Sequence, residues 1–305
     1  MAWGICEWYG QPIEEMAPTE RREAATDSLS DTPVSELGRP CPFVQHLLPG
    51  APCNKKGGVC SIKPYTEDSN MAMPAATCPR RLMALDRDGH DVFDVLAKEC
   101  FDLSPSDPYA VVREVPFLEK VDQDGEARGA KAGRIDWILV VDPNDERSEW
   151  IAIETQSVYF SGGSMDIDFQ MYVNKPEQLN VTTKNRRPDW RSSGAKRLSP
   201  QLSAKSPVMR RWGKKIAVVV DQGFFDEFAA FEHDDIDFDN SEIVWVVVRY
   251  NSAMEVDIRV ERYSELDESI SALQATRPVR KQDFESDLAR EVVNRTDKVH
   301  FKTVP

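Results

Sequence analysis

The sequence has no long hydrophobic run. Its longest uninterrupted apolar stretches, residues 216–220 and 243–248, are far shorter than the roughly 20 residues that span a bilayer. The N-terminus, Met-Ala-Trp-Gly-Ile-Cys-Glu, also lacks the basic and apolar regions of a secretory signal. We therefore expect no membrane contact and an intracellular, cytoplasmic protein whose cysteines stay reduced.

Several signatures of particular activities are missing as well. The chain has no glycine-rich phosphate loop, no His-Asn-His pattern among its four histidines and no Cys-x2-Cys pair. The first two absences disfavour nucleotide-driven motors and His-Asn-His nuclease chemistry, and we expect no nucleotide cofactor. The absence of a Cys-x2-Cys pair removes the usual signature of a zinc ribbon and disfavours a rubredoxin-like redox protein.

Length and composition are those of a globular protein. The chain has 305 residues, 41% of them apolar and 30% charged, which excludes a disordered or fibrous chain and allows one large domain or two modest ones. We divide it into an N-terminal arm (1–40), a four-cysteine module (41–90) and a core (91–305).

Acidic and basic residues are unevenly distributed. A net charge of −14 disfavours a nucleic-acid partner, because phosphate binding depends on lysine and arginine. Residues 181–215, however, hold eleven Lys and Arg against one Asp, a local charge of +10 that leaves −24 for the rest. Residues 216–248 hold nine acids and no Lys or Arg. The basic run indicates either a nucleic-acid face or a solvated, loop-like segment.

Hydrophobic periodicity predicts a mixed α/β fold. Strands are expected at 134–141 and 150–156, joined as an antiparallel hairpin through the turn-rich 142–145, and at 215–220, 243–250 and 254–260. A helix at 224–231 would connect two of these strands as a strand-helix-strand unit. Further helices are expected at 19–25, 91–101, 264–273 and 283–293. Together these elements predict a mixed sheet with helices on its faces.

Four cysteines, Cys41, Cys53, Cys60 and Cys78, fall in a segment rich in proline and glycine. This segment lacks the long apolar runs of an ordinary core, so we expect something else to hold it together. Thiolate coordination of zinc or iron would do so. The spacing Cys-x11-Cys-x6-Cys-x17-Cys leaves a metal site and four free thiols about equally open.

The predicted hairpin carries acids within apolar strands. Glu154 and Gln156 project from one side of the second strand, and Asp136 lies on the first. Two carboxylates on adjacent strands can share Mg²⁺, which activates water for attack on phosphorus. The alternative is structural: Asp136 pairs with Arg134 or another basic residue, and Glu154 caps a turn.

Short motifs occur in one order along the first half of the chain. They are Tyr9-Gly10, Cys41-Pro42-Phe43, Gly58-Val59-Cys60, Cys78-Pro79, Ile135-Asp136-Trp137 and Ile153-Glu154-Thr155-Gln156 followed by Phe160-Ser161-Gly162. An Asp and, on the next strand, Glu-x-Lys or Glu-x-Gln form the core of the PD-(D/E)xK nuclease superfamily. Together these motifs resemble the NotI family of type II restriction endonucleases. The resemblance is dense over residues 41–163 and thin beyond them.

The resemblance implies a PD-(D/E)xK nuclease core and a homodimeric, Mg-dependent prokaryotic enzyme that cuts GC-rich double-stranded DNA. It also implies an iron site at the four cysteines. By position, Asp136 and Glu154 are the metal-binding catalytic carboxylates, and Gln156 stands where most of the superfamily has lysine. An amide hydrogen-bonds, whereas lysine also brings positive charge. A further upstream acid is expected, with these candidates: Glu114, Glu119 and Glu126.

The basic run would then contact DNA, with arginines reading guanine through their paired donors. The expected DNA-binding residues are Arg186, Arg187, Arg191, Lys196, Arg197, Arg210 and Arg211. A different class of protein also fits the sequence, a DNA-binding regulator with a four-cysteine zinc finger and no catalysis.

Overall fold

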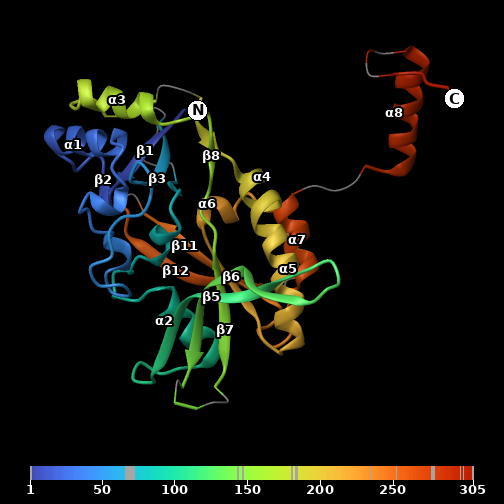
Figure 1. Ribbon diagram of the computed structural model, residues 1–305, viewed down its shortest axis with the longest axis horizontal. Helices are drawn as coiled ribbons and strands as arrows, with labels where there is room; N and C mark the ends of the chain where they lie inside the picture. The colour runs from blue at the N-terminus through green and yellow to red at the C-terminus, as the bar shows by residue number, and fades with distance from the viewer. Residues whose placement is uncertain are drawn as a thin grey trace.

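Two β-sheets organise the protein (Figure 1). The computed structural model describes residues 2–65, 73–142, 144–145, 148–179, 181–182, 185–233, 235–251, 253–275, 279–295, 297 and 299–303. The larger sheet has six strands in the order β12-β11-β10-β7-β6-β5, and the smaller has four in the order β2-β1-β3-β4. Two short strands, β8 (Phe160–Ser161) and β9 (Arg187–Pro188), pair separately.

The larger sheet is mixed, as the sequence predicts. At its centre β6 (Ala127–Val141) pairs antiparallel with β7 (Trp150–Thr155), while β7, β10 (Ile216–Asp221) and β11 (Ile243–Tyr250) run parallel. The edge strands β5 (Tyr109–Val121) and β12 (Val256–Ser264) pair antiparallel with their neighbours. Every residue of β10 is buried, because both faces of the sheet are covered at that point.

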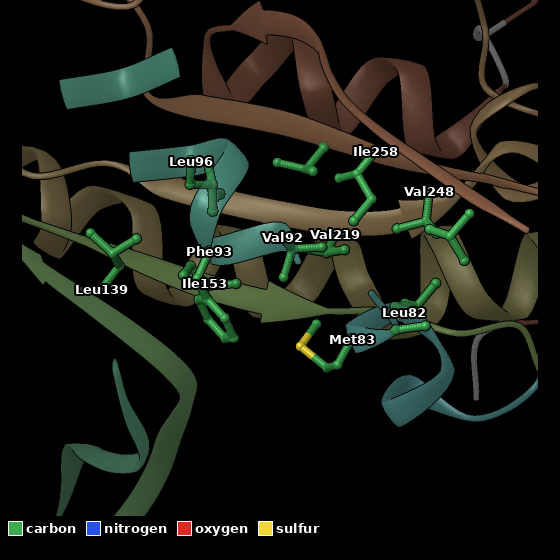
Figure 2. Packing of buried hydrophobic residues seen from close by; sticks show 14 of the residues in the cluster. Leu82, Met83, Val92, Phe93, Leu96, Leu139, Ile153, Val219, Val248 and Ile258 are labelled. Carbon is green, nitrogen blue, oxygen red and sulfur yellow. The ribbon is translucent and has the colours of Figure 1, made fainter. Parts of the chain in front are cut away.

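Helices cover both faces of this sheet. Helix α2 (Val92–Phe101) begins at Asp91, whose side chain accepts hydrogen bonds from the N–H groups of Phe93 and Asp94. Figure 2 shows Phe93 and Leu96 packed beside Leu139 and Ile153. The other face is covered by α4 (Trp190–Ser193), a π-helical segment (Gly194–Leu198), α5 (Ser199–Arg211) and α7 (Leu266–Gln274).

Two local expectations differ from the structure. Helix α6 spans only Gln222–Phe225, so the helix expected at 224–231 is mostly absent. The reason is tertiary: Phe225, Phe228 and Phe231 pack their rings around Trp245 of β11. Strand β5 was not expected, because charged residues and Pro116 interrupt its apolar pattern; an edge strand tolerates both.

The first forty residues contribute two strands to the smaller sheet. Strand β1 (Ala2–Trp8) pairs with β3 (Val59–Tyr65), and β2 (Gln11–Pro12) and β4 (Ala75–Ala76) flank them. Helices α1 (Pro18–Leu29) and α3 (Asp166–Asn174) lie side by side against this sheet (Figure 1). The segment expected to be an arm therefore shares a buried cluster with the cysteine segment, and the domain division stays a prediction.

Contacts of Arg81 and Ala76 join the smaller sheet to the larger one. Arg81 lies between the rings of Phe43 and Tyr250, and its Nε is 2.7 Å from Oε2 of Glu7. The N–H of Ala76 donates to Asp221 Oδ2 over 2.6 Å, and its carbonyl accepts from the N–H of Val158 over 2.8 Å. The two sheets are thus packed together through buried polar contacts.

The C-terminal helix α8 (Lys281–Asn294), expected at 283–293, lies apart from the body in Figure 1 and buries none of its residues. Among the described helices, none has the length and apolar character needed to cross a membrane.

Candidate active site

Asp136 and Glu154 lie on neighbouring strands, as predicted. The pairing of Trp137 with Ile153 in the β6–β7 register places Asp136 across from Glu154. Glu154 shares its face of β7 with Ala152, which packs in the apolar cluster beneath α5. The hairpin therefore presents two carboxylates together on the sheet face that α5 covers.

The structural alternatives for these acids do not match the contacts observed. Asp136 Oδ2 accepts hydrogen bonds from the N–H and the hydroxyl of Thr155, at 2.9 and 2.8 Å. Arg134 instead pairs with Glu114, over 3.4 Å. Glu154 caps no turn, since its Oε1 accepts a hydrogen bond from Lys205 Nζ over 2.5 Å. Asp136 is thus fixed by its neighbour on β7, with one oxygen facing Thr155.

The ionisation of Glu154 is unfavourable in this position. Glu154 is 2% exposed, and burial together with the charge of Asp136 raises the pKa of Glu154 to about 7, against the opposing effect of Lys205. A divalent cation would offset both effects. Mg²⁺ binds through one or two carboxylates, so this pair suits it, although no group of three or more metal-ligating side chains occurs in the described residues.

Gln156 follows β7 directly and is buried. Its N–H donates to the carbonyl of Val219 over 3.0 Å, and its side-chain Nε2 donates to the carbonyl of Ser157 over 2.5 Å. The amide of Gln156 is therefore occupied by the main chain.

Of the three upstream acids, Glu114 is nearest to Asp136 in the strand register, but its side chain is 63% exposed and pairs with Arg134. Glu114 lies between the register pairs Arg113–Trp137 and Val115–Ile135, and hence across from Asp136. Glu119 and Glu126 lie further along the β5–β6 hairpin, away from Asp136. The register thus places Glu114 across from Asp136, while the described residues contain no group of three metal-ligating side chains there.

Lys205 also contacts the acidic pair, which its place in the basic run does not predict. The basic run predicts a loop-like segment over residues 199–211, but they form α5, which contains Pro207. The signal was present, because the buried residues Leu202, Lys205, Ser206 and Met209 follow the i, i+3, i+4, i+7 spacing of a packed helix face.

The four cysteines lie close together in the smaller sheet and its loops. Each is 5–6% exposed. Burial raises the pKa values of Cys53, Cys60 and Cys78, and the charge of at least one other thiol of the four raises each further. Gly57 and Gly58 precede Cys60 with φ of 75° and 65°, and the Tyr9 ring occupies the space that a Cβ at Gly58 would need. The donor chemistry suits zinc or iron, but the described residues contain no closed metal-binding group, so the metal module is not shown.

Six of the seven basic residues expected at DNA are exposed, namely Arg187, Arg191, Lys196, Arg197, Arg210 and Arg211. Arg197 lies 3.5 Å from the centre of the Tyr159 ring. Arg186 differs, because it is buried, paired with Asp168, and donates to the carbonyl of Ser164 over 2.9 Å. Lys184, the first residue of the basic run, lies outside the described residues.

Comparison with known families identifies the class of the protein as a restriction endonuclease, a nuclease that acts on double-stranded DNA. The matching family is described as restriction endonuclease NotI, and its model covers residues 27–264 of the 305. The chain therefore belongs to the NotI family, and the similarity extends about 100 residues beyond the motifs that indicated it. No curated protein matches the chain.

Proposed function

We propose that this protein is a Mg-dependent type II restriction endonuclease that acts as a homodimer on GC-rich DNA, in a prokaryotic restriction-modification system. One observation carries the catalytic part of the proposal: Asp136 and Glu154 lie across from each other on the face of the sheet beneath α5. Two adjacent carboxylates repel each other; Lys205 pairs with Glu154, and a divalent cation would neutralise both carboxylates. A DNA-binding regulator has no use for such a pair.

Asp136 and Glu154 would hold the magnesium ion, which lowers the pKa of bound water and neutralises charge at the phosphate. Glu114, across from Asp136, would be the further acid of the site. Gln156 would orient the attacking water once its amide leaves the Ser157 carbonyl.

Exposed arginines and lysines of α4, the π-helical segment and α5 would contact DNA. They lie in the segment whose net charge is +10, and α5 also covers the acidic pair. Arginine donors match the two acceptors of guanine in the major groove, which supports the preference for GC-rich sites. Arg186 would not contact DNA, because its guanidinium is buried and bound to Asp168.

The test of this function separates DNA binding from cleavage. With Mg²⁺, the protein should cut plasmid DNA into discrete fragments, and EDTA should abolish cutting. With Ca²⁺ in place of Mg²⁺, a duplex should be bound uncut, with affinity falling steeply as salt rises, because basic residues displace counterions from phosphate. Tight binding without cleavage in any divalent metal would support the regulator instead.

We also propose that Cys41, Cys53, Cys60 and Cys78 bind one structural iron or zinc ion. The support is their burial and mutual proximity. Purified protein should contain about one equivalent of iron or zinc, measured by elemental analysis, and Cys60→Ser should lower the content and the melting temperature. Cys100→Ser is the matched control, since Cys100 is buried on α2 and the charges that act on its thiol pKa are those of Glu99 and Lys215 rather than of the four cysteines. Less than about half an equivalent in the wild type would contradict the site.

A further inference from the structure

A buried lysine reaches the acidic pair from a helix. Lys205 lies on the face of α5 that also buries Leu202 and Met209, and it is 7% exposed. Its Nζ donates to Oε1 of Glu154 over 2.5 Å. A buried ammonium is costly unless it is paired, and an apolar side chain of similar volume would pack there at least as well. Packing alone therefore does not explain a lysine at this position.

Lys205 brings positive charge to a site where the side-chain amide of Gln156 is neutral. The charges of Asp136 and Lys205 act on Glu154, and the neutral side chain of Gln156 is bound to the carbonyl of Ser157. Within the described part of the chain, Glu154 is the hydrogen-bond partner of Lys205. An ammonium has three N–H groups, so two remain for other acceptors.

We propose that Lys205 is a catalytic residue, whose ammonium supplies from α5 the positive charge that Gln156 lacks. This inference rests on the proposed nuclease function. The N–H groups of Lys205 not bound to Glu154 would contact the attacking water or a phosphate oxygen.

The hydrolysis itself involves no oxidation or reduction. The water oxygen forms a bond to phosphorus as the bond from phosphorus to the leaving sugar oxygen breaks. The attacking water loses a proton to solvent, and the leaving oxygen gains one from solvent. The Lys205 ammonium keeps its protons and stabilises negative charge that develops on the phosphate.

The substitution Lys205→Met should move two measurements in opposite directions. Cleavage with Mg²⁺ should slow by at least about 100-fold, the usual loss when one electrostatic stabiliser is removed. Binding of Mn²⁺ to the free protein, measured by calorimetry, should tighten about threefold or more, because a cation beside the carboxylates is gone. A merely structural lysine would lower both, since a disordered site neither cuts nor binds metal.

Relocation of the charge provides a second test. The double substitution Gln156→Lys/Lys205→Met restores an ammonium beside Glu154 from the strand and should regain at least about tenfold in rate over Lys205→Met. Lys63→Met is the control, because Lys63, on β3 of the smaller sheet, pairs over 2.6 Å with Glu14, whose side chain is 55% exposed. It should change neither cleavage nor Mn²⁺ binding.

The outcomes are distinguishable. A wild type that does not cut DNA with Mg²⁺ counts against the nuclease function. If the wild type cuts and Lys205→Met cuts within threefold of it, or if cutting and Mn²⁺ binding are lost together at an unchanged melting temperature, the role of Lys205 is wrong. Should Lys205→Met not fold, Lys205→Gln keeps a hydrogen bond to Glu154 without the charge and is judged by the same two measurements.

Discussion

Asp136→Asn and Glu154→Gln should each slow plasmid cleavage by about three orders of magnitude or more. Each substitution keeps the shape of the side chain and removes one of two adjacent carboxylates. A bound metal ion contributes several kcal/mol of charge stabilisation in phosphate chemistry, and each 1.4 kcal/mol or so corresponds to tenfold in rate. The rate is measured as the disappearance of supercoiled plasmid at saturating Mg²⁺.

The control for this prediction is an exposed glutamate next to the same strand. Glu149 immediately precedes β7, its side chain is 64% exposed, and it pairs with Lys214 away from Asp136. Glu149→Gln should cut at the wild-type rate. A Glu154→Gln protein that melts like the wild type and still cuts within tenfold of it would show that Glu154 is not a metal ligand.

Arg81→Met should lower the free energy of unfolding by about 3–5 kcal/mol, the usual cost of leaving one charge of a buried pair without its partner. Arg81 and Glu7 are each 2% exposed and lie 2.7 Å apart, and Arg81 also stacks between Phe43 and Tyr250. Urea denaturation of the whole chain gives the measurement.

Removing both charges should restore most of this loss. In Glu7→Leu/Arg81→Met no buried charge remains, and apolar replacement of a whole buried pair is often neutral or stabilising. The double variant should therefore be more stable than Arg81→Met alone. A loss below about 1 kcal/mol in the single variant, the value of an exposed pair, would mean that water reaches Glu7 in solution.

The acidic hairpin could be predicted because its signals are local. Apolar residues alternate with Asp136 and Glu154 on either side of a turn-rich segment, and strand alternation then fixes which face each acid occupies. The buried strands β10 and β11 were similarly evident as continuous apolar runs.

The remainder of the site depends on contacts between distant segments. Lys205 joins Glu154 across 51 positions of sequence, and neither its charge nor its neighbours indicate which strand α5 covers. In the sequence, Arg186 is one arginine of a basic run. In the structure it is buried by its ion pair with Asp168, and the sequence does not indicate this partner. Glu114 could be separated from Glu119 and Glu126 only once the β5–β6 register was known.

The same limit applies to the cysteine segment. Its composition indicates correctly that it lacks a core of its own, but the packing comes from Trp8 before it and from Phe169 and Tyr172 after β7. Periodicity within one segment carries no information about such a cluster, which depends on how the chain folds back on itself.

The hydrogen bonds of Ala76 limit how proteins of this architecture can be recombined. Its N–H is bound by Asp221, the last residue of β10, and its carbonyl by Val158, four residues after Glu154. A chimaera that joins this N-terminal half to the core of another family member therefore places its junction a few residues from Glu154 of the proposed active site. Asp221 has to be transferred together with β4, because its side chain binds the N–H of Ala76, whereas any residue other than proline supplies the N–H at position 158.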